Sequence, residues 1–166
     1  MPNKRLAGLD FGLARIGVAV SDPSGTLASG LGIVKAHKKR DQTARLVWQF
    51  LERDQKERDY TLEAIILGFP LLLSGKVGTQ ADAVTLFQGE LAKLTAVPII
   101  LWDERLTTMQ AERALREAEL NRKQRSQVVD TVAAIIILQN YLAFLQGQRE
   151  RQTPPPSNTP SPNTPL

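Results

Sequence analysis

Cysteine is absent from this chain of 166 residues, and histidine occurs once, as His37. Disulfides, thiolate nucleophiles and zinc sites built from Cys and His are therefore excluded. A Ser-His-Asp triad would have to use His37, which lies in a basic run (residues 35–40) typical of an exposed loop. We infer that any catalysis depends on carboxylates.

Long apolar runs are missing too. No stretch approaches the roughly 18 apolar residues of a transmembrane helix, and the N-terminus lacks the apolar core of a signal peptide. We expect a cytoplasmic protein that does not contact membranes. Hydrophobic content of 42% and charged content of 23% fit one soluble domain with a sizeable core. The net charge of +4 and the pI near 9.6 favour an anionic partner such as nucleic acid.

The pattern of apolar residues predicts a mixed α/β fold. Three opening strands (6–11, 15–20 and 26–34) have links too short for crossovers, so we expect an antiparallel meander. Alternating elements follow, with helices over 41–59, 79–94, from 107, and over 128–145, and strands over 63–68 and 99–102. This order predicts a five-stranded sheet with helices on both faces, in a domain spanning residues 1–148. Residues 149–166, rich in Pro, Ser, Thr and Asn, are expected to be disordered.

Acidic residues stand at the ends of three predicted elements. Asp10 follows an apolar strand, the pair Asp103-Glu104 follows another, and Asp130 opens the last helix. Ligands of open α/β sheets gather at the carboxyl ends of strands. Neighbouring strand residues point to opposite faces, so one of Asp103 and Glu104 can share a site with Asp10. We favour Glu104 because its side chain is longer.

Asp130 has two interpretations. It precedes Ala133, Ala134 and Ile137 at helical spacing, which places it on the sheet-facing side of the helix. The two small alanines would let the helix approach the strand ends closely. Alternatively, Asp130 caps the helix by accepting hydrogen bonds from free backbone N–H groups.

Three converging carboxylates without His or Cys form a hard oxygen site suited to Mg²⁺ or Mn²⁺. Such an ion polarises a phosphodiester and lowers the pKa of an attacking water. Basic residues near these acids could bind phosphate, although each group alone could equally be ordinary solvated surface. One group lies between the last two helices and the other follows the third strand: Arg113, Arg116, Arg122, Lys123 and Arg125, and Lys35, Lys38, Lys39 and Arg40.

Four motifs in order resemble those of the YqgF family, also called RuvX-like. They are Leu9-Asp10-Phe11-Gly12 with Arg15-Ile16-Gly17, Gly68-Phe69-Pro70, Asp103-Glu104-Arg105-Leu106-Thr107-Thr108, and Asp130 before Ala133-Ala134. The resemblance spans about residues 5–145. Members of this family have been described as Holliday junction resolvases and as nucleases for the 5′ end of pre-16S ribosomal RNA. The resemblance implies a ribonuclease H-like fold.

The resemblance also implies that Asp10, Asp103, Glu104 and Asp130 are the active-site acids. Three departures affect the site. Many members have Asn where Leu72 stands and Lys where Val128 stands, and related resolvases have an acid where Gly68 stands. Lys123 or Arg125 could replace the missing lysine as a phosphate contact.

The leading hypothesis is a metal-dependent nuclease that acts on structured RNA, the 5′ end of pre-16S ribosomal RNA. Asp10, Glu104 and Asp130 would hold Mg²⁺ or Mn²⁺, and Arg15 and Arg105 would bind phosphate. Two alternatives stay open. One is a resolvase of branched DNA, which needs a homodimer where the RNA nuclease could be a monomer. The other is a non-catalytic nucleic-acid-binding factor in ribosome assembly.

Overall fold

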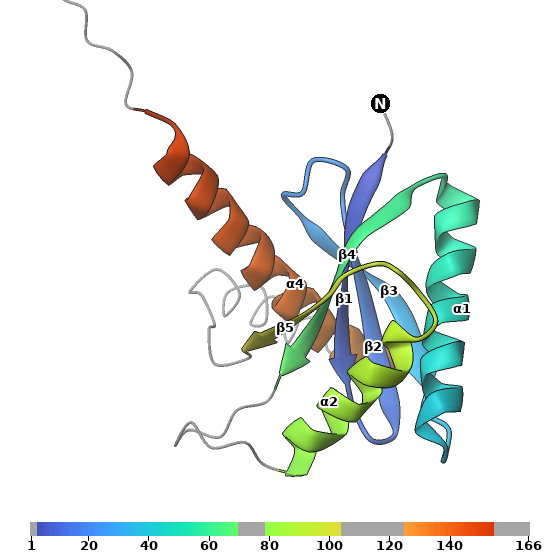
Figure 1. Ribbon diagram of the computed structural model, residues 1–166. Helices are drawn as coiled ribbons and strands as arrows, with labels where there is room; N and C mark the ends of the chain where they lie inside the picture. Colours follow the sequence, from blue (N-terminus) through green and yellow to red (C-terminus); the bar gives the residue numbers. More distant parts are fainter. Residues whose placement is uncertain (1–2, 70–78, 104–124, 155–166) are drawn as a thin grey trace, which may run out of the picture.

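The computed structural model describes residues 3–69, 79–103 and 125–154, with side chains throughout except at 79–80 and 125–130. Five strands form one sheet in the order β3-β2-β1-β4-β5 (Figure 1). The strands are β1 (Lys4–Phe11), β2 (Arg15–Ser21), β3 (Ala28–Lys35), β4 (Thr61–Phe69) and β5 (Ile99–Asp103). The three described helices are α1 (Arg40–Arg58), α2 (Thr79–Ala92) and α4 (Arg125–Gln152).

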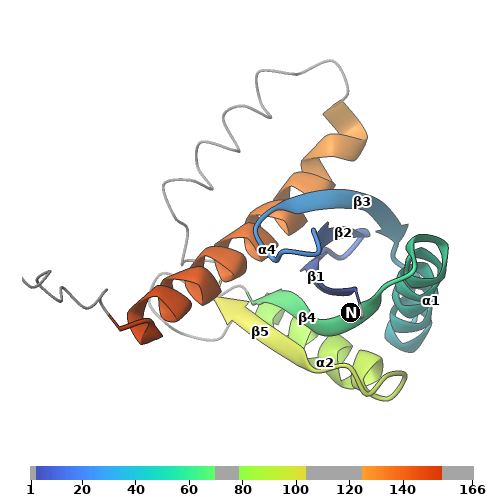
Figure 2. The same cartoon turned by 90° about the horizontal axis from the view of Figure 1, so that it is seen from above.

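The first three strands pair antiparallel, whereas β4 and β5 join the sheet in parallel to β1. Seen from above, α4 covers one face of the sheet, and α1 and α2 lie on the other (Figure 2). Two apolar cores result, one on each face. The central strand β1 contributes to both, because Leu9 packs under α1 and α2 while Leu6 packs under α4.

Gly8 sets the distance between β1 and α4. A Cβ atom built at Gly8 would lie 2.7 Å from the Cβ of Leu138 and 3.0 Å from the backbone oxygen of Ala134. Both distances are shorter than ordinary contacts, so the helix backbone rests directly against the strand. The apolar face of α4 thereby covers the same side of β1 that carries Asp10, two residues further along.

The fold predicted from the sequence is confirmed, including the opening meander and the later alternation of strands and helices. The last helix is longer than expected, because α4 continues to Gln152, past the expected domain boundary at residue 148. The helix predicted from residue 107 and the tail from residue 155 lie outside the described residues. Among the helices that are described, none combines the length and the apolar character needed to cross a membrane.

Candidate functional site

Asp10 is the next-to-last residue of the central strand and is partly buried. It pairs with Gly17 of β2, and on its other side it lies one residue beyond the pair of Leu9 with Leu67, next to Gly68 of β4. Because side chains along β1 point alternately to the two faces of the sheet, Asp10 lies on the same face as Gly8, which is the face covered by α4. The two strands that flank Asp10 thus place no side chain directly beside its carboxylate.

A cavity of about 160 Å³ opens in front of Asp10, between the sheet and α4. One wall comes from Trp102 of β5, which pairs with Gly68 and so lies two strands from Asp10. The other wall is formed by one side of α4: Ala133, Ile136, Ile137 and Asn140. The cavity combines an acidic strand end with a largely apolar helix, which favours a small site with few polar groups.

Sequence reasoning missed two polar groups at this cavity. Asn140 is 4% exposed on an otherwise apolar helix face. Its spacing of three residues from Ile137 could have revealed it as a buried polar residue on the cavity side. Trp102, at the end of the strand predicted over residues 99–102, packs edge to face on Tyr141, with ring centroids 5.1 Å apart and planes at 85°. Its indole nitrogen is buried and, among the described residues, has no hydrogen-bond partner, which is rare in native structures.

The predicted acid pair at the end of β5 is described in part. Asp103 is the last residue of the strand and pairs with Phe69 of β4. Ile99 and Leu101 contribute to the core under α1 and α2, so alternation places Asp103 on that face and Trp102 on the face of Asp10. Glu104, which was favoured over Asp103, lies outside the described residues.

Asp130 lies within α4, in its second turn, because the helix begins at Arg125. A capping residue precedes the first turn, so the alternative interpretation of Asp130 as a helix cap is wrong. Position 130 precedes Ala133 by three residues and Ile137 by seven. On a helix this spacing places it on the same stripe as the cavity wall, about 4.5 Å before Ala133 along the axis.

Among the predicted phosphate contacts, Arg15 is the one with a described side chain. It is exposed at the first position of β2. It shares the α4 face with Gly17 and Ala19, since Ala19 belongs to the core beneath α4. Arg15 is therefore at the same end and on the same face of the sheet as Asp10. Arg105 and Lys123 lie outside the described residues, and of Arg125 the structure gives the backbone.

The oxygen atoms of Asp10 and Asn140 fit a hard divalent cation, because Mg²⁺ and Mn²⁺ prefer carboxylate, amide and water oxygens. The described side chains contain no group of three acids or imidazoles that could enclose a metal ion. The predicted partners of Asp10, Glu104 and Asp130, have no described side chains. The structure thus supplies one carboxylate and a cavity that the other acids could complete.

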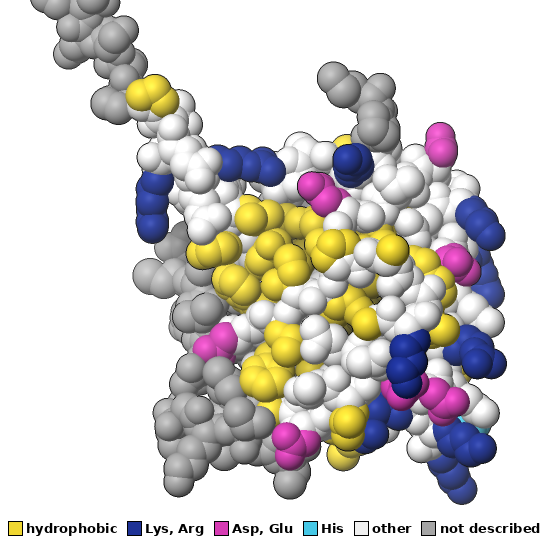
Figure 3. Space-filling view, viewed as in Figure 1, with side chains coloured by type: hydrophobic (Ala, Val, Ile, Leu, Met, Phe, Trp, Pro, Cys, Tyr) yellow, Lys and Arg dark blue, Asp and Glu magenta, His cyan; other side chains and the backbone are white. Residues whose placement is uncertain are grey.

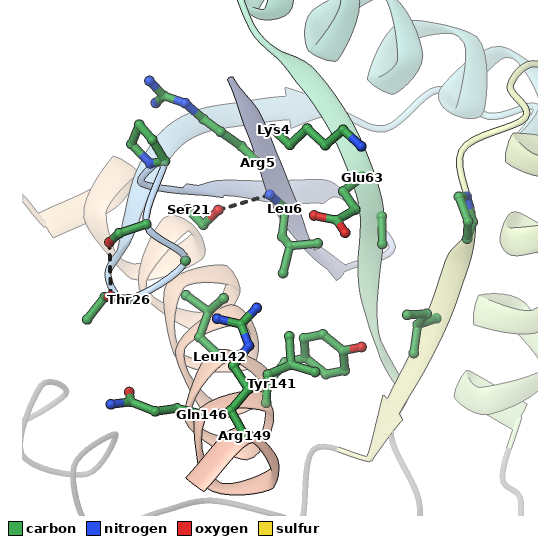
Figure 4. A pocket seen from close by; sticks show the side chains of 17 residues that line it. Lys4, Arg5, Leu6, Ser21, Thr26, Glu63, Tyr141, Leu142, Gln146 and Arg149 are labelled. Atoms are coloured by element: carbon green, nitrogen blue, oxygen red, sulfur yellow. Dashed lines mark hydrogen bonds between the residues drawn. The ribbon is translucent and has the colours of Figure 1, made fainter. Parts of the chain in front are cut away.

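Another cavity, of about 500 Å³, lies at the opposite end of the sheet, and Figure 4 shows the side chains that line it. It is bounded by the first residues of β1, β4 and β5 and by the last turns of α4. Its charged lining is mixed, with Lys4, Arg5 and Arg149 around Glu63. Asp10 and Asp103, the two predicted catalytic acids whose side chains the structure describes, do not line it, so its size does not make it the candidate active site.

A family model described as "RuvX: Holliday junction resolvase" matches residues 4–144. The chain belongs to the RuvX family. Two curated relatives are both named "Putative pre-16S rRNA nuclease". The one from Protochlamydia amoebophila (strain UWE25) is 48% identical over 138 residues, covering 83% of this chain and 92% of the relative. The one from Bacillus subtilis (strain 168) is 39% identical over 141 residues, covering 85% of this chain and 99% of the relative.

Solved structures agree with the RuvX assignment at the level of the fold. The structure titled "T. thermophilus RuvC in complex with Holliday junction substrate" superimposes with a TM-score of 0.54 at 18% identity. The match covers 87% of this chain and 96% of the other. At that identity the likeness shows a shared fold, which confirms the ribonuclease H-like, RuvC-like sheet expected from the sequence.

Proposed function

We propose that this RuvX-family protein is a divalent-metal-dependent nuclease that hydrolyses phosphodiester bonds at the 5′ end of pre-16S ribosomal RNA. The observation that carries the proposal is the position of Asp10 at the carboxyl end of the central strand, facing a cavity roofed by α4. The shared name of the relatives from P. amoebophila and B. subtilis supports the choice of substrate.

Asp10, Glu104 and Asp130 would hold the metal, Mg²⁺ or Mn²⁺. When bound, such an ion stabilises the negative charge on the phosphate and lowers the pKa of an attacking water. Asp10 is held by its pair with Gly17 of β2 and lies directly after the pair of Leu9 with Leu67 of β4, so its carboxylate needs little reorganisation to bind a cation. Asp103 lies on the other face by alternation, and we therefore assign the ligand role to Glu104.

Substrate phosphates would lie along the same edge of the sheet. Arg15 shares the face of Asp10 and is exposed beside the cavity, where a guanidinium can bind a phosphate through two hydrogen bonds. Arg105 directly follows Asp103-Glu104, and Lys123 and Arg125 precede Asp130 in the chain, so these residues would contact substrate phosphates as well. The apolar wall from α4 would limit access of bulk water to the reacting phosphate.

The decisive test replaces Asp10 by Asn, which keeps the shape and removes the charge. Asp82→Asn, on the exposed side of α2, is the matched control. We expect Asp10→Asn to lower Mn²⁺-dependent cleavage of a pre-16S 5′ fragment by more than about 100-fold. Losing a residue that only supports a metal ligand lowers activity by up to about 100-fold, and losing the ligand itself should cost more. The control should cleave like wild type. Undiminished cleavage by Asp10→Asn would refute the assignment.

Metal binding can be tested without cleavage. A ligand that binds the folded state at 100 times its dissociation constant stabilises it by about 2.7 kcal/mol. Mn²⁺ should therefore raise the melting temperature of wild type and of Asp82→Asn, and have little effect on Asp10→Asn. EDTA should reverse the shift. An equal shift in all three proteins would place the metal elsewhere.

A DNA junction is the second candidate substrate, favoured by the description of the family model that matches residues 4–144. A resolvase cuts two strands symmetrically and so acts as a dimer. Cleavage of a synthetic four-way junction, measured beside cleavage of the RNA fragment, separates the two substrates. The mass of the protein in solution distinguishes a monomer from a homodimer.

Gly68 favours a third candidate, a nucleic-acid-binding factor without catalysis. It lies between Asp10 and Trp102, where related resolvases have an acid, and so supplies no fourth carboxylate. Such a factor would bind RNA and cleave neither substrate at any Mg²⁺ or Mn²⁺ concentration. Cleavage that depends on Asp10 would exclude it.

A further inference from the structure

A second cavity, of about 180 Å³, opens at the same end of the sheet as Asp10 but on the side of α1. Its walls come from the end of β1, the hairpin between β1 and β2, the loop that links β3 to α1, and the first turn of α1: Phe11, Leu13, Ala36, His37, Lys38, Arg40 and Thr43. We call it the hairpin pocket. Asp10, the one predicted metal ligand whose side chain the structure describes, does not line it.

Positive charge gathers around the hairpin pocket. Lys38 and Arg40 line it, and Lys35 and Lys39 lie next to them in the chain. Within the described part of the chain, none of these four side chains forms an ion pair. Side chains coloured as Lys and Arg are prominent at the lower right of the molecular surface, over the amino end of α1 (Figure 3). These four basic side chains outnumber Asp41, the acidic residue in the first turn of α1, so the net positive charge favours an anionic ligand.

The loop beneath these cations is braced by hydrogen bonds. The hydroxyl of Thr43, which is buried, accepts a hydrogen bond from the backbone N–H of His37 at 2.9 Å and donates to its carbonyl at 3.2 Å. The ring Nδ1 of His37 accepts from the backbone N–H of Lys39 at 3.2 Å. In this arrangement Nε2 carries the proton and acts as a further donor to an oxygen atom. The pocket is thus preorganised for an acceptor-rich ligand.

Leu13 adds an apolar surface at the tip of the hairpin, where its side chain is 82% exposed. The tip is tight, because the N–H of Gly12 donates to the carbonyl of Arg15 at 2.9 Å, and a Cβ at Gly12 would lie 2.6 Å from that oxygen. The leucine is therefore held out in solvent by a rigid turn beside cationic side chains. Apolar side chains in such surroundings contact the bases and sugars of nucleic acids.

We propose that the hairpin pocket binds a nucleotide of the nucleic-acid substrate outside the cleavage centre, with its phosphate on Lys38 and Arg40 and its sugar or base against Leu13. The proposal rests on the proposed nuclease function and extends the substrate path. The hairpin pocket and Asp10 lie at the same end of the sheet but on opposite faces, so the substrate would have to pass around the ends of β1 and β2 to occupy both.

The charge contribution is tested by the double variant K38Q/R40Q. Its matched control is R53Q/K56Q, which removes two exposed charges from the other end of the same helix. Binding of a labelled pre-16S 5′ fragment is measured by fluorescence anisotropy in EDTA, where no cleavage occurs, between 50 and 200 mM KCl. Raising the KCl concentration over this range weakens binding through each phosphate contact. When two contacts are lost, the factor by which affinity falls becomes about tenfold smaller. We expect this change for K38Q/R40Q and none for R53Q/K56Q.

The contribution of Leu13 is tested by Leu13→Ser, with Leu27→Ser as control. Leu27 is 65% exposed at the β2–β3 turn, at the opposite end of the sheet. Leu13→Ser should weaken binding with the salt dependence unchanged, because an apolar contact releases no counterions. Leu27→Ser should bind like wild type.

Equal affinity losses in the two charge variants, or an unchanged salt dependence in K38Q/R40Q, would overturn the proposal. No cleavage occurs in these binding measurements, so the proposed subsite and the proposed catalytic role of Asp10 can be refuted independently of each other. If K38Q/R40Q binds the RNA fragment as tightly as wild type, the proposed subsite is refuted and the proposed role of Asp10 is unaffected. Binding that depends on the pocket, in a protein that never cleaves, keeps the subsite and refutes the nuclease. A protein that binds neither the RNA fragment nor a DNA junction refutes both.

Discussion

Replacing Gly8 by Ala tests the close packing of α4 on the central strand. The added methyl group would lie 2.7 Å from the Cβ of Leu138, whereas carbon atoms in contact are about 3.5–4.0 Å apart. Helix and strand must therefore separate by about 1 Å. Such overpacking costs about 1–3 kcal/mol, and the lower entropy of the unfolded Ala chain offsets about 0.5–1 kcal/mol of it. We expect a net loss of about 1–2 kcal/mol.

Urea unfolding and thermal melting measure this loss. For a chain of this size each kcal/mol corresponds to about 2–4 °C, so the melting temperature should fall by about 4 °C. Gly89→Ala is the control, because a Cβ at Gly89 meets nothing within 4 Å in α2. There we expect a gain of about 0.5–1 kcal/mol. If Gly8→Ala proved as stable as wild type, the reasoning from close packing would be refuted.

Three further variants test local interactions. Asp22→Ala should lower stability at pH 7 by about 1 kcal/mol, because hydrogen bonds, first from a serine hydroxyl, hold the pKa of Asp22 below its usual value. That contribution is lost as the pH falls through this lowered pKa, so urea unfolding near pH 3 should show a smaller difference. Thr43→Val should cost about 1–2 kcal/mol in denaturant unfolding, since the backbone N–H of His37 loses its partner; an unchanged midpoint would contradict the bracing role. Tyr60→Phe removes a hydrogen bond of 2.6 Å to Asp54. Burial, and secondly this hydrogen bond, raise the pKa of the Tyr60 hydroxyl. The stabilisation is therefore complete at pH values below the ordinary tyrosine pKa, and it is lost as the pH rises through the raised pKa of the folded protein. The variant should be less stable at pH 7 by about 1 kcal/mol and equal to wild type at strongly alkaline pH.

The sequence predicted the position of Asp10 well, because a strand has a two-residue period that neighbours in the chain reveal. Alternation along the predicted strand puts Leu6, Gly8 and Asp10 on one face, and in the structure all three lie on the α4 face. Position 130 was likewise expected on the sheet-facing stripe of the last helix. Its interpretation as a cap was wrong because α4 begins earlier, at Arg125, among polar residues that carry no apolar period.

The walls of the cavity could not be predicted in the same way. Trp102 reads as one of four apolar strand residues, and its role depends on β5 lying beside β4, which is a matter of sheet order. Asn140 becomes a cavity residue because α4 crosses β1 at Gly8, a contact between segments far apart in the chain. The ligand role of Glu104 stays a prediction.

The route of the chain through the sheet has a consequence for protein synthesis. Asp10 lies on a strand that is translated early, whereas the opposite wall of its cavity, from Ala133 to Asn140, is translated late. Nascent chains that still lack α4 expose the α4 face of β1, including Asp10, to solvent and have no assembled cavity. The cavity in front of Asp10 therefore forms when α4 docks on the sheet. A nuclease whose centre includes Asp10 would thus stay inactive in a nascent chain until α4 has been synthesised and packed.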